Sequence, residues 1–124
     1  MPRAIKIKAG KWTVKAELND SSTAKTIGDA LPISAVASRW GGEIYFSIPV
    51  RTSLEDGARE VLQPGELGYW PTGNAFCIFF GPTPASDGDE IRAASAVNII
   101  GRVTGSWFEL WNVADGAPVK IESA

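Results

Sequence analysis

Apolar and polar residues alternate from the start of the chain. In residues 4–9, AIKIKA, isoleucines alternate with lysines, and residues 12–18, WTVKAEL, repeat the pattern after Gly10. A period of two predicts half-buried β-strands with their apolar side chains on one face. The glycine between the two runs predicts that they form a hairpin.

The pattern changes between residues 19 and 32, NDSSTAKTIGDALP. Its polar start, residues 19–22, offers several helix N-caps. Ala24 and Ile27 follow at helical spacing, and Pro32 ends the run. One short helix is predicted here.

The β pattern returns after residue 32 and continues towards the end of the chain. Residues 33–40 and 43–50 flank a Gly-Gly pair, which predicts a second hairpin. Residues 75–80, AFCIFF, form a continuous apolar run, which indicates a strand that is buried on both faces or lines a pocket. Residues 107–113, WFELWNV, fit a short helix and a strand equally well.

These runs add up to about eight short strands and one clear helix, separated by frequent Gly and Pro turns. The sum predicts a mainly β protein, a small barrel or sandwich with a helix closing one end. The length of 124 residues predicts a single domain that spans residues 1–124.

The charge and hydropathy of the chain limit its partners. Hydrophobic residues make up 44% and charged residues 21%, as in ordinary soluble proteins, and the net charge is −2. Such a charge gives no general attraction to nucleic acid or to anionic membranes. No segment approaches the roughly 20 apolar residues of a membrane helix. We therefore expect neither nucleic acid nor a membrane as a partner.

The counts of cysteine and histidine exclude several kinds of chemistry. One cysteine cannot form an internal disulfide, and residues 1–10 lack the apolar run of a signal peptide, so we expect a cytoplasmic protein. The absence of histidine excludes Ser-His-Asp and Cys-His catalysis and histidine metal sites. The acidic residues 87–90 lack the spacing of a calcium loop. No metal and no cofactor is expected.

Three segments resemble a known family. Residues 39–49, RWGGEIYFSIP, residues 65–84, GELGYWPTGNAFCIFFGPTP, and residues 98–105, NIIGRVTG, are similar to signature segments of small uncharacterised bacterial and archaeal proteins with a cyclophilin-like fold. The resemblance covers essentially the whole chain. It implies a closed eight-stranded β-barrel capped by one or two short helices.

The resemblance does not carry an activity with it. Cyclophilins that are prolyl isomerases set an Arg close to a Phe-His pair, with Gln and Gly-Gly a little downstream, and this chain has no such run. Arg39, before Trp40 and a Gly-Gly pair, resembles that motif only superficially. The chain is therefore not assigned as an enzyme from its sequence.

The aromatic stretch of residues 65–84 is the best candidate for a binding site. Tyr69 and Trp70 carry polar groups that need partners, and they precede a Pro-containing turn. Our hypothesis is that five side chains rim one cleft. They are Tyr45, Tyr69, Trp70, Phe80 and Thr83. The alternative is a rigid turn packed on the barrel.

Polar candidates accompany this cleft. Glu43 lies beside the aromatic cluster and is the best single acid/base candidate, with a surface carboxylate as the alternative. Arg92 follows the acidic loop and either pairs with one of its acids or meets a ligand carboxylate in the cleft. Cys77 has apolar neighbours, which predicts a buried and unreactive thiol.

Three functional hypotheses follow from these residues. The first is a protein that binds a small molecule or a Pro-containing peptide in the aromatic cleft. The second is a divergent peptidyl-prolyl isomerase. The third is an interaction subunit, because Trp107 and Trp111 lie four residues apart and would share a helix face that docks on the barrel or on a second copy in a homodimer.

Overall fold

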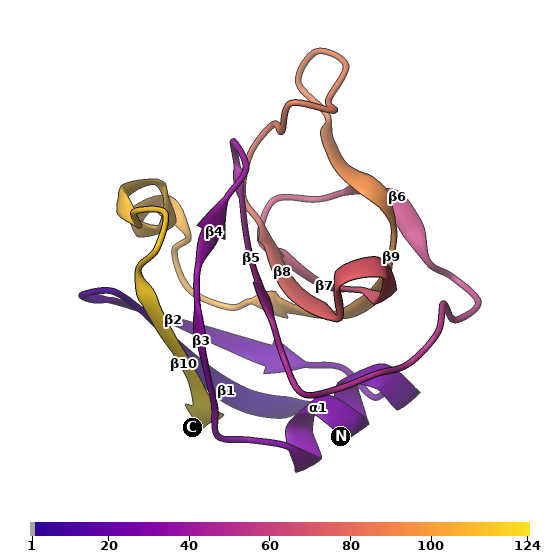
Figure 1. Cartoon of the computed structure of the whole chain (residues 1–124), viewed down its shortest axis with the longest axis vertical. Coiled ribbons are helices and arrows are strands. Elements are labelled where there is room, and N and C mark those ends of the chain that lie inside the picture. The colour runs from indigo at the N-terminus through magenta and orange to yellow at the C-terminus, as the bar shows by residue number, and fades with distance from the viewer. Residues whose placement is uncertain (1) are drawn as a thin grey trace.

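The computed structural model describes residues 2–124 and is built almost entirely from antiparallel strands (Figure 1). The elements follow the chain as β1 (Arg3–Ala9), β2 (Trp12–Leu18), α1 (Ser22–Asp29), β3 (Ile33–Val36), β4 (Ser38–Arg39), β5 (Glu43–Ser47), β6 (Arg59–Leu62), β7 (Glu66–Trp70), the 3-10 helix η1 (Pro71–Gly73), β8 (Ala75–Phe79), β9 (Ile91–Val103), the 3-10 helix η2 (Phe108–Asn112) and β10 (Pro118–Ser123).

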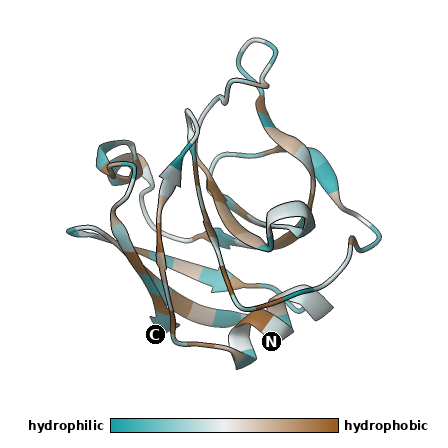
Figure 2. Cartoon of the chain, in the orientation of Figure 1, coloured by the Kyte–Doolittle hydropathy of each residue, from teal (hydrophilic) through white to brown (hydrophobic). Residues whose placement is uncertain are grey.

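The first hairpin forms as the alternation predicts. β1 pairs with β2 so that Ile5 lies opposite Ala16 and Ile7 opposite Val14. These apolar residues are buried, whereas Lys8 is exposed on the other face. Figure 2 shows hydrophobic and hydrophilic bands alternating along β2. β10 pairs with the other edge of β1, which extends this part of the sheet.

The predicted helix is present as α1. Ser21 is its N-cap, and the Ser21 side chain accepts a hydrogen bond from the backbone N–H of Ala24 at 3.2 Å. The helix ends at Asp29, before the Leu31–Pro32 pair. Ala24 and Ile27 are buried in the main core, so the helix covers one end of the sheet (Figure 1).

The strand order does not confirm the expected closed barrel. Among residues 2–124 the sheet has ten strands, with nine in the order β3-β10-β1-β2-β9-β7-β8-β5-β4 and β6 paired with β9 outside this path. The hydrogen-bonded path begins at β3 and ends at β4, so a closed eight-stranded barrel is not confirmed. The expected strand over residues 33–40 divides at Ala37, whose backbone N–H donates to the Ala117 carbonyl at 2.8 Å instead of joining a ladder. A mainly β fold is confirmed.

The long strand β9 separates two apolar clusters. Its second half pairs with β7 and β2, and its first half leaves the main sheet and pairs with β6 (Figure 1). The β6–β9 pair covers the outer face of β7 and β8 and buries a second cluster, here called the outer cluster. Its members are Leu62, Ala75, Cys77, Phe79, Ile91, Ala93 and Val97.

A glycine allows this close crossing. A Cβ atom at Gly68 on β7 would lie 2.7 Å from Cγ2 of Val97 on β9. Such an approach is shorter than van der Waals contact permits. The lack of a side chain at Gly68 therefore lets β9 pass directly over β7.

The undecided stretch near residue 110 forms the 3-10 helix η2. Trp107 packs against the main core, and Trp111 meets Phe80 edge-on with ring centroids 4.9 Å apart. Phe108 points outward and is 72% exposed. Within residues 2–124, no helix is both long and apolar enough to cross a membrane.

Candidate functional site

A small cavity lies between the outer face of the main sheet and the first half of β9. Its volume is about 220 Å³. It is lined by Trp40, Glu43, Tyr45, Trp70, Ala93, Ala94 and Val97. Aromatic and small apolar side chains thus surround a single carboxyl group.

Strand register brings these side chains to one face. Glu43 of β5 lies opposite Phe79 of β8, and Tyr45 lies opposite Cys77. Opposite residues in an antiparallel pair share a face of the sheet. Glu43 and Tyr45 therefore point to the outer side, which β9 covers with small residues.

Trp70 reaches the same face from β7 and is fixed in place. It lies opposite Ala75 of β8. Its indole Nε1–H donates a hydrogen bond to Oγ of Ser95 on β9 at 2.6 Å. The ring is half-buried, so one part packs on the outer cluster and another part remains open to the cavity.

Glu43 is the chemically distinctive group of the cavity. It is only 5% exposed, and in residues 2–124 no basic group forms an ion pair with its carboxylate. Burial raises the pKa of Glu43 from 4.5 to about 7, against a smaller lowering by a hydrogen bond with Cys77. Loss of hydration disfavours the charged form of an acid. Near neutral pH this carboxyl group therefore exchanges readily between its two protonation states.

Cys77 lies beneath the cavity in the outer cluster. It is 1% exposed, and the pKa of its thiol is raised by burial and, to a lesser degree, by the neighbouring Glu43. A protonated and inaccessible thiol is a poor nucleophile. The prediction that Cys77 is buried is confirmed.

We expect Cys77 to resist thiol reagents in the folded protein. Dithiobis-nitrobenzoate should label no thiol of the native chain and one thiol after unfolding in guanidinium, because only the exposed thiolate reacts. A Cys77→Ser, Ser123→Cys variant is the matched control, since position 123 is exposed and should react at once. Rapid labelling of the native wild-type protein would contradict the buried position.

The structure does not bring all predicted cleft residues to the cavity. Glu43, Tyr45 and Trp70 line it together. Tyr69 does not, because it is 0% exposed on the opposite face of β7. Its hydroxyl donates to the Val50 carbonyl at 2.6 Å and lies 3.2 Å from Oδ1 of Asn74, so it is a satisfied core residue. The expectation that Tyr69 rims the cleft is wrong.

Phe80, Thr83 and Arg92 also lie away from the cavity. Phe80 is 4% exposed and packs in the main core. Thr83 is buried, and its hydroxyl donates to the Arg92 carbonyl. The Arg92 guanidinium binds Glu90 at 2.6 Å and Glu60 at 3.2 Å, which leaves it in a surface ion-pair cluster. The common cleft expected for these residues therefore does not form.

Four cavity residues were not expected from the sequence. Trp40 precedes the Gly-Gly turn of the second hairpin, and Ala93, Ala94 and Val97 belong to β9. The signal for Trp40 was available, because a hairpin turn places it close to Glu43. The contribution of β9 had no local signal, because it depends on the crossing of β9 over β7.

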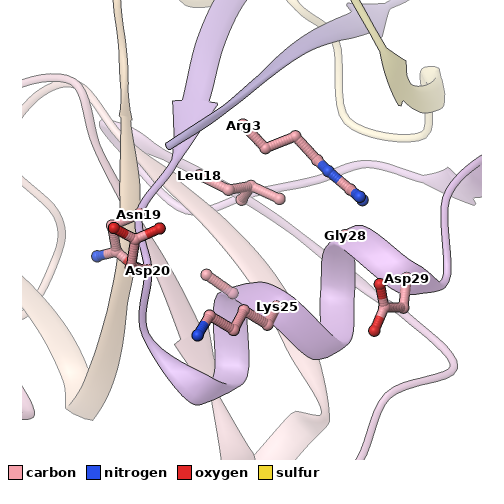
Figure 3. Close-up of a pocket in the computed structure, with 8 residues that line it drawn as sticks. Arg3, Leu18, Asn19, Asp20, Lys25, Gly28 and Asp29 are labelled. Atoms are coloured by element: carbon pink, nitrogen blue, oxygen red, sulfur yellow. The ribbon is translucent and has the colours of Figure 1, made fainter. Parts of the chain in front are cut away.

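A larger hollow of about 410 Å³ lies between α1 and the ends of β1 and β2 (Figure 3). Its four charged side chains are all exposed and of both signs. They are Arg3, Asp20, Lys25 and Asp29. Figure 3 shows the Arg3 guanidinium extending above α1 near Gly28. Mixed exposed charges select no ligand class, so this hollow is a weaker candidate than the aromatic cavity.

No metal centre accompanies either hollow. The side chains of residues 2–124 contain no group of three or more Cys, Asp or Glu residues placed to hold a metal ion. The aromatic cavity instead offers apolar surface to a ligand, and its one carboxyl, that of Glu43, can exchange a proton or form an ion pair.

The antiparallel sheet with a helix at one end, and a cavity on its outer face, define a small β-domain of the cyclophilin-like class. The family model described as Cyclophilin-like matches residues 3–122, so the chain belongs to the cyclophilin-like family.

A solved structure agrees with this assignment. The chain is similar to the solution structure of a hypothetical protein from Archaeoglobus fulgidus, at 42% identity and a TM-score of 0.85. The match covers 99% of this chain and 95% of that one. The comparison with curated proteins gave no match.

Proposed function

We propose that this protein binds a small molecule or the side chain of an extended peptide in the cavity between β5, β7 and β9. The observation that carries the proposal is the carboxyl group of Glu43, which is 5% exposed and faces an aromatic cavity without an ion-pair partner in residues 2–124. A buried carboxyl is costly to charge unless a partner compensates it. A bound ligand would supply that partner.

The size of the cavity supports a small ligand. A volume of about 220 Å³ lies below the roughly 300–1,000 Å³ of pockets that enclose drug-sized molecules. The cavity therefore suits a compact group, which is either a whole small metabolite or one side chain of a longer partner.

The rigidity of the surroundings also supports binding. Glu43, Tyr45 and Trp70 lie on paired strands rather than on loops, so their positions are fixed by the sheet.

We extend the proposal to the sheet as a whole. Its two end strands, β3 and β4, are joined through Ala37, and this connection holds the sheet in a barrel-like curl. The buried free thiol of Cys77 suits the reducing cytoplasm as the site of action.

A catalytic role for Glu43 is the second candidate function. An acid with a pKa of about 7 in a cleft matches the requirement of general acid–base catalysis near neutral pH. Prolyl isomerisation is a less suitable form of this role, since no arginine lines the cavity. Arg39 donates to carbonyls of Gly41 and Val113, and Arg92 binds acidic side chains. Binding without turnover explains the geometry with fewer assumptions.

The interaction-subunit hypothesis receives less support. Trp107 packs against the main core and Trp111 packs on Phe80, so the two tryptophans do not form a free docking face. The exposed parts of the Phe108 and Trp111 rings on η2 together are too small a surface for a stable homodimer.

A fragment screen tests the proposed function. Compact neutral, cationic and Pro-containing fragments are titrated into nitrogen-labelled protein, and the five tryptophan indole signals are followed by NMR. We expect ligands to shift the signals of Trp40 and Trp70, which line the cavity, and not those of Trp12 and Trp107.

An Ala94→Phe variant provides the control. Ala94 lines the cavity but is exposed, so a larger side chain should fill the cavity without disturbing the core. We expect this variant to lose the shifts. A screen in which no fragment moves the Trp40 or Trp70 signals would contradict the proposed function.

A further inference from the structure

We propose that the cavity recognises an organic ammonium ion, held by the Glu43 carboxylate and the ring faces of Trp40, Tyr45 and Trp70. This inference rests on the proposed function, because it names the ligand class of the same cavity. The ligand would carry its positive charge on a compact group such as a primary or methylated amine.

The charges around the cavity favour a cation over other ligands. Glu43 is the one charged side chain among the residues that line it, and these residues include no lysine or arginine. An anion would face a carboxylate with no compensating positive group. A wholly apolar ligand would leave the Glu43 carboxylate with its hydrogen bond to Cys77 but without an opposite charge in a dry site, which costs free energy. A cation satisfies the carboxylate and is the ligand that improves the site electrostatically.

The aromatic rings favour the same ligand. The face of an aromatic ring carries partial negative charge, and Trp attracts cations most strongly, by about 0.5–1 kcal/mol when exposed and about 2 kcal/mol when desolvated. Trp40, Tyr45 and Trp70 all line this cavity. Three rings and a carboxylate form the kind of cage that binds methylated ammonium groups, whose hydration is weaker than that of a primary ammonium.

The roof of the cavity leaves room for such a group. β9 contributes Ala93 and Ala94 to the roof, and each side chain is a single methyl group. The hydrogen bond from Trp70 to Ser95 holds the indole ring against this strand. The site is therefore largely formed before a ligand binds, which limits the entropy lost on binding.

Protonation of Glu43 couples ligand binding to pH. Burial raises the pKa of this carboxyl to about 7 in the unliganded protein. A bound cation favours the charged carboxylate, so binding lowers this pKa and releases a proton. Affinity for the cation therefore rises as the pH increases through 7 and becomes constant above it.

Other titratable groups have little influence on this coupling. Cys77 and Tyr45 share the face of the sheet with Glu43, and the thiol of Cys77 has a raised pKa, so it stays neutral in this range. The remaining charged groups on the strands around the cavity are bound to partners of their own. They are Arg39 with the carbonyls of Gly41 and Val113, Arg59 with Glu66, Arg92 with Glu90 and Glu60, and Arg102 with Glu17.

A pair of isosteric probes tests the inference. Choline carries a trimethylammonium group, and dimethylbutanol is its neutral isostere, in which a carbon atom replaces the nitrogen. A peptide with one trimethyl-lysine tests whether the same group is recognised on a chain. We expect choline or the peptide to shift the Trp40 and Trp70 signals until the site is saturated. The affinity for choline should be at least about tenfold higher than that for dimethylbutanol. The affinity should fall about tenfold from pH 8 to pH 6.

Variants separate the roles of charge and shape. Glu43→Gln should weaken the preference for the cation and remove the pH dependence, because the amide cannot supply the negative charge and only the rings still attract the cation. Glu109→Gln is the matched control, since it removes one negative charge from η2, away from the cavity, and should leave both unchanged.

The outcomes distinguish this inference from the proposed function. Equal affinity for choline and dimethylbutanol, or binding of neutral fragments alone, would overturn the ammonium assignment and leave the binding cavity in place. Cation binding that Glu43→Gln leaves unchanged would also overturn it. If no fragment or probe moves the Trp40 and Trp70 signals, both the inference and the proposed function fail.

Discussion

Replacing Glu43 with Gln is expected to raise the free energy of unfolding by about 3 kcal/mol above pH 7. The carboxyl group is 5% exposed, and burial raises its pKa from 4.5 to about 7. Between these two values the folded protein holds a proton that the unfolded chain has released. Stability therefore falls as the pH rises from 4.5 to about 7, and the loss is complete above 7. Below 4.5 both states are protonated, so the cost of the carboxyl disappears.

Urea unfolding measured across this pH range checks the expectation. The difference between wild type and Glu43→Gln should be small at the acidic end and should grow until the pH passes about 7. Glu109→Gln should follow the wild-type curve, because its side chain is partly exposed on η2 and forms no ion pair among the described residues. Parallel curves for wild type and Glu43→Gln would mean that Glu43 titrates as an ordinary surface acid.

The second large effect is expected at Gly42, beside the same carboxyl. A Cβ atom at this position would lie 2.3 Å from the carbonyl carbon and 2.4 Å from the Cα atom of Gly81. Both neighbours are backbone atoms, so no side chain can move away. Gly42 also accepts from the N–H of Phe80 at 2.8 Å and donates to the Pro82 carbonyl at 2.8 Å. Gly42→Ala should force these segments apart and lower the free energy of unfolding by about 3 kcal/mol.

Gly105→Ala is the matched control for this substitution. Apart from Gly105 and its two chain neighbours, no residue has an atom within 4 Å of the position that its Cβ would occupy. We expect it to change stability by less than about 0.5 kcal/mol in the same denaturation experiment. A Gly42→Ala protein as stable as Gly105→Ala would show that the contact between residues 42 and 81 is looser than the structure has it.

Local sequence patterns predicted the elements that depend on local physics. The alternation in β1 and β2 determines which side chains are buried, because a strand has only two faces. The apolar run of β8 predicted a strand that is buried on both faces or lines a pocket, and the first alternative is confirmed because all five of its residues are buried. The helix α1 followed from its N-cap and its apolar spacing.

The error at Tyr69 arose from treating residues 65–84 as one binding stretch. Tyr69 and Trp70 are neighbours on β7, and neighbours on a strand point to opposite faces. The alternation rule therefore already separates them: Trp70 reaches the cavity, and Tyr69 enters the main core. Recognising that the strand continues to residue 70 would have avoided the error.

The roof of the cavity was beyond local prediction. Ala93 and Val97 join Glu43 only because β9 crosses over β7 at Gly68. Nothing in residues 91–97 indicates which strand lies beneath them. Similarly, the family resemblance anticipated the cyclophilin-like class but not the break at Ala37, which depends on a backbone hydrogen bond to a distant segment.

The continuity of β9 limits how the cavity can open. The first half of β9 lies above the cavity and pairs with β6. The second half of the same strand pairs with β2 and β7. The first half of β9 cannot move away from the cavity unless its hydrogen bonds to these strands break. Under the proposed function, a ligand would therefore have to enter past the exposed side chain of Ala94, which lines the cavity, without movement of β9.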